Sequence, residues 1–279
     1  MNLPLLPDSA LRVRLAGRLD LLDAPTLWDG GDVPGLEGSQ KRIEESQRRL
    51  WASRSAGLLV IIQGLDASGK DGTIRRLTQA MDPMGVRVKG FAKPTAEELA
   101  HDFTWRAVPH FPARGEVVIF NRSHYEAVLV ERVLAGGSPV AQDGQSWQAR
   151  YQYLRELELH LVSSGTRILK VWLHLSADEQ RKRLLKRVTN ERKQWKFDPS
   201  DVDTWQQRER YLSLASAMIA ATHSDVAPWH VVPADDKGTM RALVCELVAE
   251  ALESVAGEYP AADDALCDRY ESILKEKQK

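Results

Sequence analysis

The chain has 279 residues, with 38 basic and 39 acidic side chains and a formal net charge of −1. Its 43% apolar and 28% charged residues are ordinary globular values, which exclude wholesale disorder and a general affinity for nucleic acid. The two cysteines, Cys245 and Cys267, lie in no metal-binding or redox spacing and favour a reduced, intracellular protein. No run is apolar enough to span a membrane and the first residues lack a basic leader region, so we expect a soluble cytoplasmic protein.

Glycine and proline recur through residues 17–38, which predicts an irregular N-terminal arm covering about residues 1–38. The next segment, SQKRIEESQRRLWASR, places Ile43, Leu50 and Trp51 on one side at helical spacing. Ser39 stands where an N-cap residue would. We therefore expect the first long helix to begin at Ser39.

Five short, β-rich apolar runs alternate with helical stretches along the chain. The first, GLLVIIQG, is unbroken, as strands buried on both faces of a parallel sheet are. The alternation predicts an α/β fold with a doubly wound parallel sheet, and the lack of repeats or long linkers predicts one domain over residues 1–279. The runs are 57–64, 85–91, 115–120, 166–175 and 228–234.

A phosphate-binding pattern follows the first strand directly. The segment GLDASGKD spaces Gly64, Gly69 and Lys70 as G-x-x-x-x-G-K, between a predicted strand and a predicted helix. The glycines let backbone N–H groups turn toward an anion, the helix N-terminus adds positive dipole, and the lysine reaches a terminal phosphate. The sequence therefore predicts a P-loop.

Two positions depart from an ordinary P-loop. Asp71 replaces the Ser or Thr whose hydroxyl binds Mg²⁺, and the third strand ends in Asn121 where a second metal-holding acid is usual. Asp66 leaves the sheet at its C-terminal edge, where it is placed to hold Mg²⁺ or orient a phosphate nucleophile. Asp71 either takes a direct part or caps the following helix, and the sequence leaves both interpretations open.

A strongly basic segment occupies residues 181–196, with eight basic side chains and one acidic one. Like charges at i,i+4 destabilise an isolated helix, so an anionic ligand should compensate, although a solvated surface is the plain alternative. After a P-loop, the segment is typical of a helical lid, here about residues 178–210, that closes over phosphates. Its charge suits a phosphate chain longer than one triphosphate. The basic residues are Arg181, Lys182, Arg183, Lys186, Arg187, Arg192, Lys193 and Lys196.

Several long motifs together resemble the family 2 polyphosphate kinases over about residues 40–252. They are GLDASGKDGTIRRL, EELAHDFTWR, RGEVVIFNRSHYEAVLVERV, QWKFDPSD and APWHVVPADDK. The resemblance implies a P-loop NTPase-like, nucleotide-kinase-like fold, and phosphoryl transfer between inorganic polyphosphate and nucleotides with Mg²⁺, or Mn²⁺ in its place. The N-R-S-x-Y-E version resembles class III, whose members phosphorylate both AMP and ADP.

The resemblance also implies roles for residues. Asp66, Lys70 and Arg122 would be catalytic, with Asp66 also serving the metal, and Asn121 and Glu126 would help bind the nucleotide. Ser68 stands where Ala is common in the family, which removes none of these groups. Phosphate contacts are expected from Gly64, Ala67, Ser68, Gly69, Asp71, Gly72, Thr73, Lys93, Arg132, Arg181, Lys182 and Arg187.

Other polar residues have a structural interpretation beside the functional one. His124 is expected to pack rather than to act as a nucleophile, which favours direct in-line transfer without a phosphoenzyme. The group His101, Asp102 and Arg106 is interpreted either as a satisfied local network or as a substrate contact. Asp235 and Asp236 follow the last strand, where a helix N-cap is a simpler interpretation than a nucleotide contact.

Two rival functions remain at this stage. An ATP-dependent P-loop nucleotide or small-molecule kinase is disfavoured by Asn121 and by the excess charge of the lid. A non-catalytic regulator that binds polyphosphate would require the loss of a central group, and none is missing. The expected partners are polyphosphate and AMP or ADP, without nucleic acid or membrane, in a homo-oligomer (dimer or tetramer) with a charged tail at about residues 258–279.

Overall fold

The computed structural model describes residues 19–276, so the first 18 residues of the predicted arm lie outside the described part. Within it, five strands form a parallel sheet in the order β2-β3-β1-β4-β5. All five predicted strands and the doubly wound sheet are confirmed. The strands are β1 (Gly57–Gly64), β2 (Val86–Gly90), β3 (Val117–Asn121), β4 (Thr166–His174) and β5 (Trp229–Pro233).

Strand β1 is central, and its unbroken apolar sequence is explained by burial on both faces. Its register pairs Ile62 with Asn121 of β3 and Gly64 with Leu173 of β4. The carboxyl ends of these three strands therefore meet at one edge, which is the edge where doubly wound sheets bind ligands.

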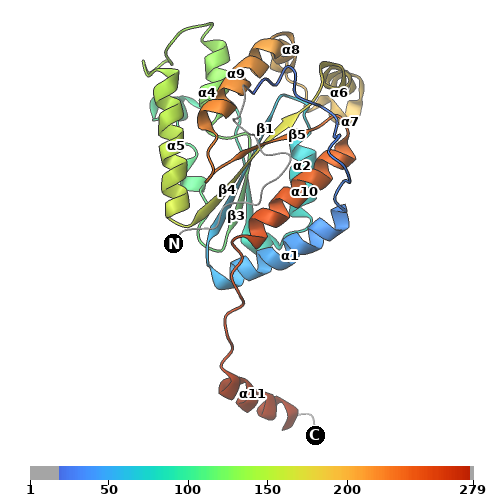
Figure 1. Cartoon of the computed structure of the whole chain (residues 1–279), viewed down its shortest axis with the longest axis vertical. Coiled ribbons are helices and arrows are strands. Elements are labelled where there is room, and N and C mark those ends of the chain that lie inside the picture. Colours follow the sequence, from blue (N-terminus) through green and yellow to red (C-terminus); the bar gives the residue numbers. More distant parts are fainter. Residues whose placement is uncertain (1–18, 277–279) are drawn as a thin grey trace.

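Helices cover both faces of the sheet (Figure 1). One layer is made by α1 (Leu36–Ser53), α2 (Lys70–Thr78) and α10 (Lys237–Glu253). The opposite layer is made by α4 (Glu126–Leu134), α5 (Trp147–Ser163) and α9 (Arg208–Thr222). Short helical turns, η1 (Pro83–Gly85), α3 (Ala96–Ala100) and η2 (Val108–His110), lie in the connections of β2 and β3.

The first helix begins earlier than expected. Helix α1 starts at Leu36 after Gly35, so Ser39 is not its N-cap. Instead Ser39 is buried on the inner face of α1, and its hydroxyl donates to a Glu246 carboxylate oxygen of α10 at 2.6 Å. Ile43 and Leu50 are buried as predicted, whereas Trp51, expected on the same side, is 37% exposed.

Three helices form the segment predicted as a lid, between β4 and α9. They are α6 (Ala177–Thr189), α7 (Glu191–Gln194) and α8 (Ser200–Gln206). They lie over the ligand edge of the sheet (Figure 1). The charged tail contains α11 (Asp264–Glu276), which extends away from the body in the same view and whose described side chains are exposed.

Residues 19–35 pack along the body. Leu21 is fully buried, and its backbone N–H donates to the Ser216 hydroxyl at 2.9 Å. Thr26 and Asp235 exchange two hydrogen bonds, which ties this segment to the loop after β5. Within residues 19–276, no helix has both the length and the apolar character that a membrane span requires.

Candidate active site

The predicted P-loop lies between β1 and α2, at the ligand edge. Gly64 and Gly69 have φ of 149° and 111°, a conformation that L side chains rarely adopt. A Cβ on Gly64 would also stand 2.7 Å from the Leu173 carbonyl oxygen, so only glycine fits there. Ala67, between them, takes φ of 66° although it is not glycine. These three residues give the loop its turn toward the N-terminus of α2.

Lys70 is buried inside the loop, with 8% of its surface exposed. Its Nζ donates to the carbonyl oxygens of Gly64 at 2.7 Å and Leu65 at 3.0 Å. Burial lowers the pKa of Lys70 to about 8, and the nearby Arg122 acts in the same direction. A phosphate in the loop would favour the charged amine.

Arg122 points at the loop because of the turn that follows β3. The residue takes φ of 62°, and its backbone N–H donates to the Ile62 carbonyl oxygen. One guanidinium nitrogen, Nη2, donates to Asp66 Oδ1 at 2.5 Å, and Nη1 lies 3.6 Å from Glu126 Oε2. The structure therefore brings together three of the predicted groups from two neighbouring strand ends.

Burial changes the pKa values of Glu126 and Arg122 in this cluster. It raises the pKa of Glu126, although Arg122 and Lys70 favour the ionised carboxylate. Burial alone would lower the pKa of Arg122, but Glu126 and Asp66 raise it above its ordinary value. The site thus holds a permanent cation beside two carboxylates, in a setting where electrostatic interactions are stronger than in water.

Asp71 does not cap α2. It lies in the first turn, where its Oδ1 accepts from the Asn121 side-chain amide at 2.9 Å and its Oδ2 from Lys196 Nζ at 2.6 Å. Burial would raise the pKa of this carboxyl, but these two hydrogen bonds lower it. The cap interpretation is therefore wrong, and Asp71 forms a contact between the P-loop and the lid, while a direct role toward phosphate or metal stays a prediction.

The lid residues divide into two groups. Arg181 and Lys182 are exposed on α6, and Lys182 lies 3.3 Å from Glu179. Arg187 is turned inward and donates to Asp201 at 2.8 Å. The exposed pair can meet a polyanion, whereas Arg187 already has a carboxylate partner within the lid.

Two predicted phosphate contacts lie outside the loop. Lys93 follows β2 and is 81% exposed, with its Nζ 3.9 Å from Asp198 in the lid. Arg132, in the last turn of α4, donates to the Tyr151 hydroxyl of α5 at 2.7 Å and lies over the Trp147 ring. Lys93 therefore faces the lid, and Arg132 is directed toward α5.

The remaining predicted loop residues lie in the loop or the first turn of α2. Gly72 packs against Arg241, because a Cβ there would stand 2.8 Å from its Nη2. Thr73 donates its hydroxyl to the Gly69 carbonyl oxygen. The Ser68 hydroxyl is buried and has no hydrogen-bond partner among the described residues. That orphaned hydroxyl fits a loop built to receive phosphate oxygens.

His124 packs, as expected. It is 2% exposed among the rings of Phe111, Phe120 and Tyr125, and burial lowers its pKa to about 3. Neither ring nitrogen has a hydrogen-bond partner in the described part of the chain. The imidazole is therefore neutral and enclosed.

Two of the weaker candidates have structural contacts. Asp236 accepts from the Thr239 backbone N–H at 2.7 Å and caps α10, so the N-cap interpretation is confirmed. Asp235 accepts from the Ser176 backbone N–H. Asp102 accepts from the backbone N–H and hydroxyl of Thr104, which is the local network that the sequence offered as one interpretation.

The sequence analysis missed two polar residues on the inner face of α6 and one on α9. Gln180 is fully buried and donates to the Asp66 carbonyl oxygen at 3.1 Å. Arg183 was noticed only as one charge in a basic run, yet it is buried and donates to the carbonyl oxygens of Ala67 and Ser68. Arg208 donates to Gln180 Oε1 at 3.0 Å. Their spacing in the sequence carries no signal, because the contacts depend on how α6 packs on the loop.

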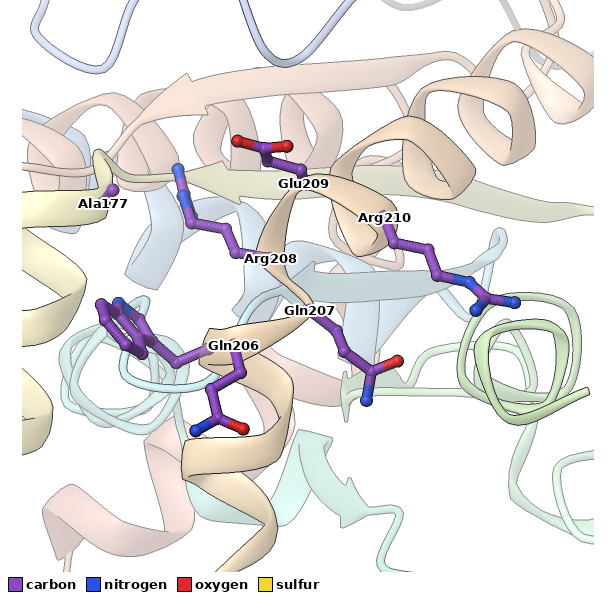
Figure 2. A pocket seen from close by; sticks show the side chains of 7 residues that line it. Ala177, Gln206, Gln207, Arg208, Glu209 and Arg210 are labelled. Atoms are coloured by element: carbon purple, nitrogen blue, oxygen red, sulfur yellow. The ribbon is translucent and has the colours of Figure 1, made fainter. Parts of the chain in front are cut away.

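A cavity of about 370 Å³ lies at the junction of α8 and α9 (Figure 2). Arg208 and Arg210 project to opposite sides of this junction, with Arg208 extending toward Ala177 at the start of α6. None of the P-loop residues lines this cavity, although its lining residue Arg208 donates to Gln180, which contacts the loop. Its lining residues are Ala177, Trp205, Gln206, Gln207, Arg208, Glu209 and Arg210.

Comparisons with known proteins show the family of this chain. Residues 33–260 match the family model described as polyphosphate kinase 2. The chain is 42% identical over 261 residues to an AMP/ADP-polyphosphate phosphotransferase of Meiothermus ruber, covering 91% of this chain and 96% of the relative. It is 40% identical over 250 residues to an ADP-polyphosphate phosphotransferase of Rhodopseudomonas palustris, covering 87% and 86%.

A solved structure agrees in fold as well as in sequence. The crystal structure of polyphosphate kinase 2 from Arthrobacter aurescens matches with a TM-score of 0.86 and 34% identity, over 95% of each chain. The sheet order and the loop described above are thus those of a P-loop kinase. From the family match and these similarities together, we conclude that the chain belongs to the polyphosphate kinase 2 family.

Proposed function

We propose that this chain is a polyphosphate-dependent nucleotide kinase that transfers phosphoryl groups from inorganic polyphosphate to AMP and ADP, giving ADP and ATP. The observation that carries the proposal is the cluster of Asp66, Lys70, Arg122 and Glu126 beneath a basic lid. The relatives from Meiothermus ruber and Rhodopseudomonas palustris, whose names state this activity with AMP/ADP and with ADP, support it.

The geometry suits a reaction in which two polyanions must meet end to end. The loop amides and Lys70 neutralise the terminal phosphate, and Arg122 stabilises charge on the transferring group. Asp66 orients the attacking phosphate oxygen, and Glu126 and Asn121 help to seat the nucleotide. The lid contacts the loop through Lys196 and Asp71 and excludes water.

We propose direct in-line transfer, without a phosphohistidine, because His124 is enclosed in the core. A phosphohistidine at His124 would require a ring nitrogen to leave the buried aromatic cluster in which it is enclosed. Transfer from donor to acceptor then depends on alignment and charge neutralisation rather than on a covalent intermediate.

Magnesium, or manganese in its place, is part of this proposal. Within residues 19–276, no cluster of three or more His, Cys, Asp or Glu side chains could hold a metal by itself. That fits Mg²⁺, which usually binds one or two carboxylates together with substrate phosphates. Asp66 would hold it, and the bound ion would supply positive charge to the phosphate oxygens.

A dedicated ATP-driven kinase fits the site less well. An ATP site usually retains an acid after the third strand, whereas here Asn121 donates its amide to Asp71. The exposed basic residues of α6 also extend beyond what one triphosphate would cover. We further propose a cytoplasmic homo-oligomer, dimer or tetramer, whose mass light scattering would measure.

The test is turnover of purified protein with Mg²⁺ and long-chain polyphosphate, offered AMP alone and then ADP alone. ADP and ATP are followed by chromatography, beside an Asp66→Asn variant. We expect both products from the unmodified chain and neither from the variant.

Each other outcome has a distinct meaning. Conversion of ADP but not of AMP would show that the class III resemblance of the N-R-S-x-Y-E motif does not extend to AMP use. If neither nucleotide reacts while ATP phosphorylates a small acceptor, the chain is a general P-loop kinase and the polyphosphate assignment fails.

A further inference from the structure

Three consecutive carbonyl oxygens of the P-loop are held from outside by two side chains of one helix. Gln180 Nε2 donates to the Asp66 oxygen at 3.1 Å. Arg183 Nη1 donates to the oxygens of Ala67 and Ser68 at 3.2 and 3.1 Å. We name Gln180 and Arg183 the loop clamp. Both lie on the inner face of α6, three residues apart, and both are buried.

By holding these carbonyl oxygens, the loop clamp also sets the direction of the N–H groups that follow them in the loop. In a planar trans peptide the C=O and the following N–H point in opposite directions. Holding the carbonyl oxygens of Asp66 and Ser68 toward α6 therefore turns the N–H groups of Ala67 and Gly69 away from α6. These are the groups that a loop of this type offers to phosphate.

Ala67 gives a second reason for the clamp. Its left-handed φ of 66° is unfavourable for a residue with a Cβ, and such a conformation persists only where contacts with the surrounding structure hold it in place. The hydrogen bond from Arg183 to the Ala67 carbonyl oxygen is a contact of that kind. The clamp thus stabilises the loop at its strained residue.

Every N–H donor of the Arg183 guanidinium makes a hydrogen bond within the protein. The guanidinium has five such donors. Two go to the P-loop, one goes from Nε to Glu179 at 2.7 Å, and two go from Nη2 to the carbonyl oxygens of Ala234 and Asp235. No donor is left for a phosphate chain, although the residue lies in the basic run of the lid.

Gln180 is fixed in the same way. Its Oε1 accepts from Arg208 Nη1 at 3.0 Å, so its amide NH₂ faces the loop. Arg208 in turn donates to the Leu175 carbonyl oxygen at the end of β4. The clamp is therefore tied to the sheet and to α9 as well as to the loop.

We propose that Gln180 and Arg183 are positioning residues that hold the P-loop in its anion-binding form, rather than ligands of polyphosphate. The catalytic part of this inference rests on the proposed function. It predicts that losing either side chain lowers turnover while the substrates still bind, because misplacing the loop misaligns the transferring phosphate.

The experiment compares Gln180→Met and Arg183→Met with Gln152→Met and Arg155→Met. The control pair has the same residue types and spacing but lies on the exposed surface of α5. We expect kcat to fall about 10- to 100-fold in each clamp variant, with KM for polyphosphate within about threefold. The control variants should stay within about twofold of the unmodified chain.

Two further measurements distinguish positioning of the loop from a simple loss of charge or of stability. Arg183→Lys keeps the charge but not the forked donors, so it should not restore kcat. Hydrogen–deuterium exchange of peptides covering residues 64–73, without ligand, should be faster in the clamp variants than in the controls. If Arg183→Met does not fold, the comparison is made between Gln180→Met and its control, Gln152→Met.

The clamp is overturned if both methionine variants keep full kcat, if the loss lies entirely in KM for polyphosphate, or if Arg183→Lys is fully active. Inactivity of the unmodified chain would instead remove the proposed function. The exchange measurement still decides the clamp in that case, because it requires no turnover, and unchanged exchange in residues 64–73 would refute it.

Discussion

At the scale of single residues, burial changes what a side chain can do. Lys70 lies inside the loop with its Nζ on two carbonyl oxygens, and its pKa is lowered to about 8. An amine that titrates so close to neutrality loses its charge in mildly alkaline solution. The Lys70 part of the positive charge at the loop is therefore lost progressively as pH rises through about 8 in the unliganded protein, whereas Arg122 stays charged.

We predict a basic limb in the pH dependence of kcat/KM for polyphosphate. The charged amine is the active form, so kcat/KM should fall as pH rises through about 8, measured from about pH 6 to about pH 10. Lys70→Arg stays protonated throughout, so any activity it retains should lack this limb. A profile of the unmodified chain that stays flat to about pH 10 would contradict the prediction.

Asp71 allows a second prediction at this scale. Its contact with Lys196 is partly exposed, and exposed ion pairs contribute about 0–1 kcal/mol. Asp71→Asn should therefore lower kcat less than about tenfold, whereas Asp66→Asn should abolish turnover. Lys196→Gln is the matched partner, and a double-mutant cycle in kcat should show that the two changes are not additive. A loss as complete as that of Asp66→Asn would mean that Asp71 acts on substrate or metal directly.

At the scale of elements, helix α6 has two functional faces. Its inner face carries the loop clamp and the buried Leu184, and its outer face carries the exposed Arg181, Lys182 and Lys186. The sequence shows all of these as one basic run. The fold separates them, because 3.6 residues per turn send neighbouring positions to different sides.

The outer face should govern affinity for the phosphate chain. Replacing Arg181, Lys182 and Lys186 by Gln should raise KM for long polyphosphate about tenfold with kcat unchanged, since three exposed charges at about 0.5 kcal/mol each contribute about 1.5 kcal/mol together. Steady-state kinetics at two salt concentrations check this, because added salt should weaken the unmodified chain more than the variant. An unchanged KM would indicate a solvated surface, and a fall in kcat would place these groups nearer the chemistry.

At the scale of the whole molecule, a buried charged network connects the core to the site. Lys170 of β4 is fully buried and donates to Glu158 of α5 at 2.6 Å and to the Thr222 carbonyl oxygen. The Tyr125 hydroxyl donates to the other Glu158 oxygen at 2.6 Å. Tyr125 lies between Arg122 and Glu126 in the sequence, so the network supports the turn that carries Arg122.

Breaking this network should destabilise the fold strongly. Lys170→Met leaves the Glu158 carboxylate buried without its cation, which typically costs about 3–5 kcal/mol in the free energy of unfolding. Because burial raises the pKa of Glu158, the loss should be smaller in acid, where the carboxyl is protonated, and should grow as pH rises. Urea unfolding at about pH 5 and about pH 8 measures this.

A double variant separates the charge from the shape of the side chain. Lys170→Met combined with Glu158→Gln removes both charges and should recover part of the lost stability. If it is less stable than the single variant, the destabilisation comes from packing and not from an uncompensated carboxylate.

The strands, the P-loop and the family could all be predicted from the amino-acid sequence, because these features depend on local patterns. An apolar run between turn residues forms a buried strand almost anywhere in a sheet, and the spacing of Gly64, Gly69 and Lys70 is complete within one short segment. The start of α1 was wrong because Ser39 resembles a cap but lies on a buried face against α10.

The partners of the charged residues could not be predicted, because they come from distant parts of the chain. Asp71 and Lys196 are 125 residues apart in the sequence. The two terminal nitrogens of Arg183 donate to main-chain oxygens of two loops that are far apart in the sequence. Arg132, expected at the phosphates, contacts Tyr151 of α5. A charge in the sequence does not state which partner will neutralise it, because that depends on which helix faces meet when the chain packs.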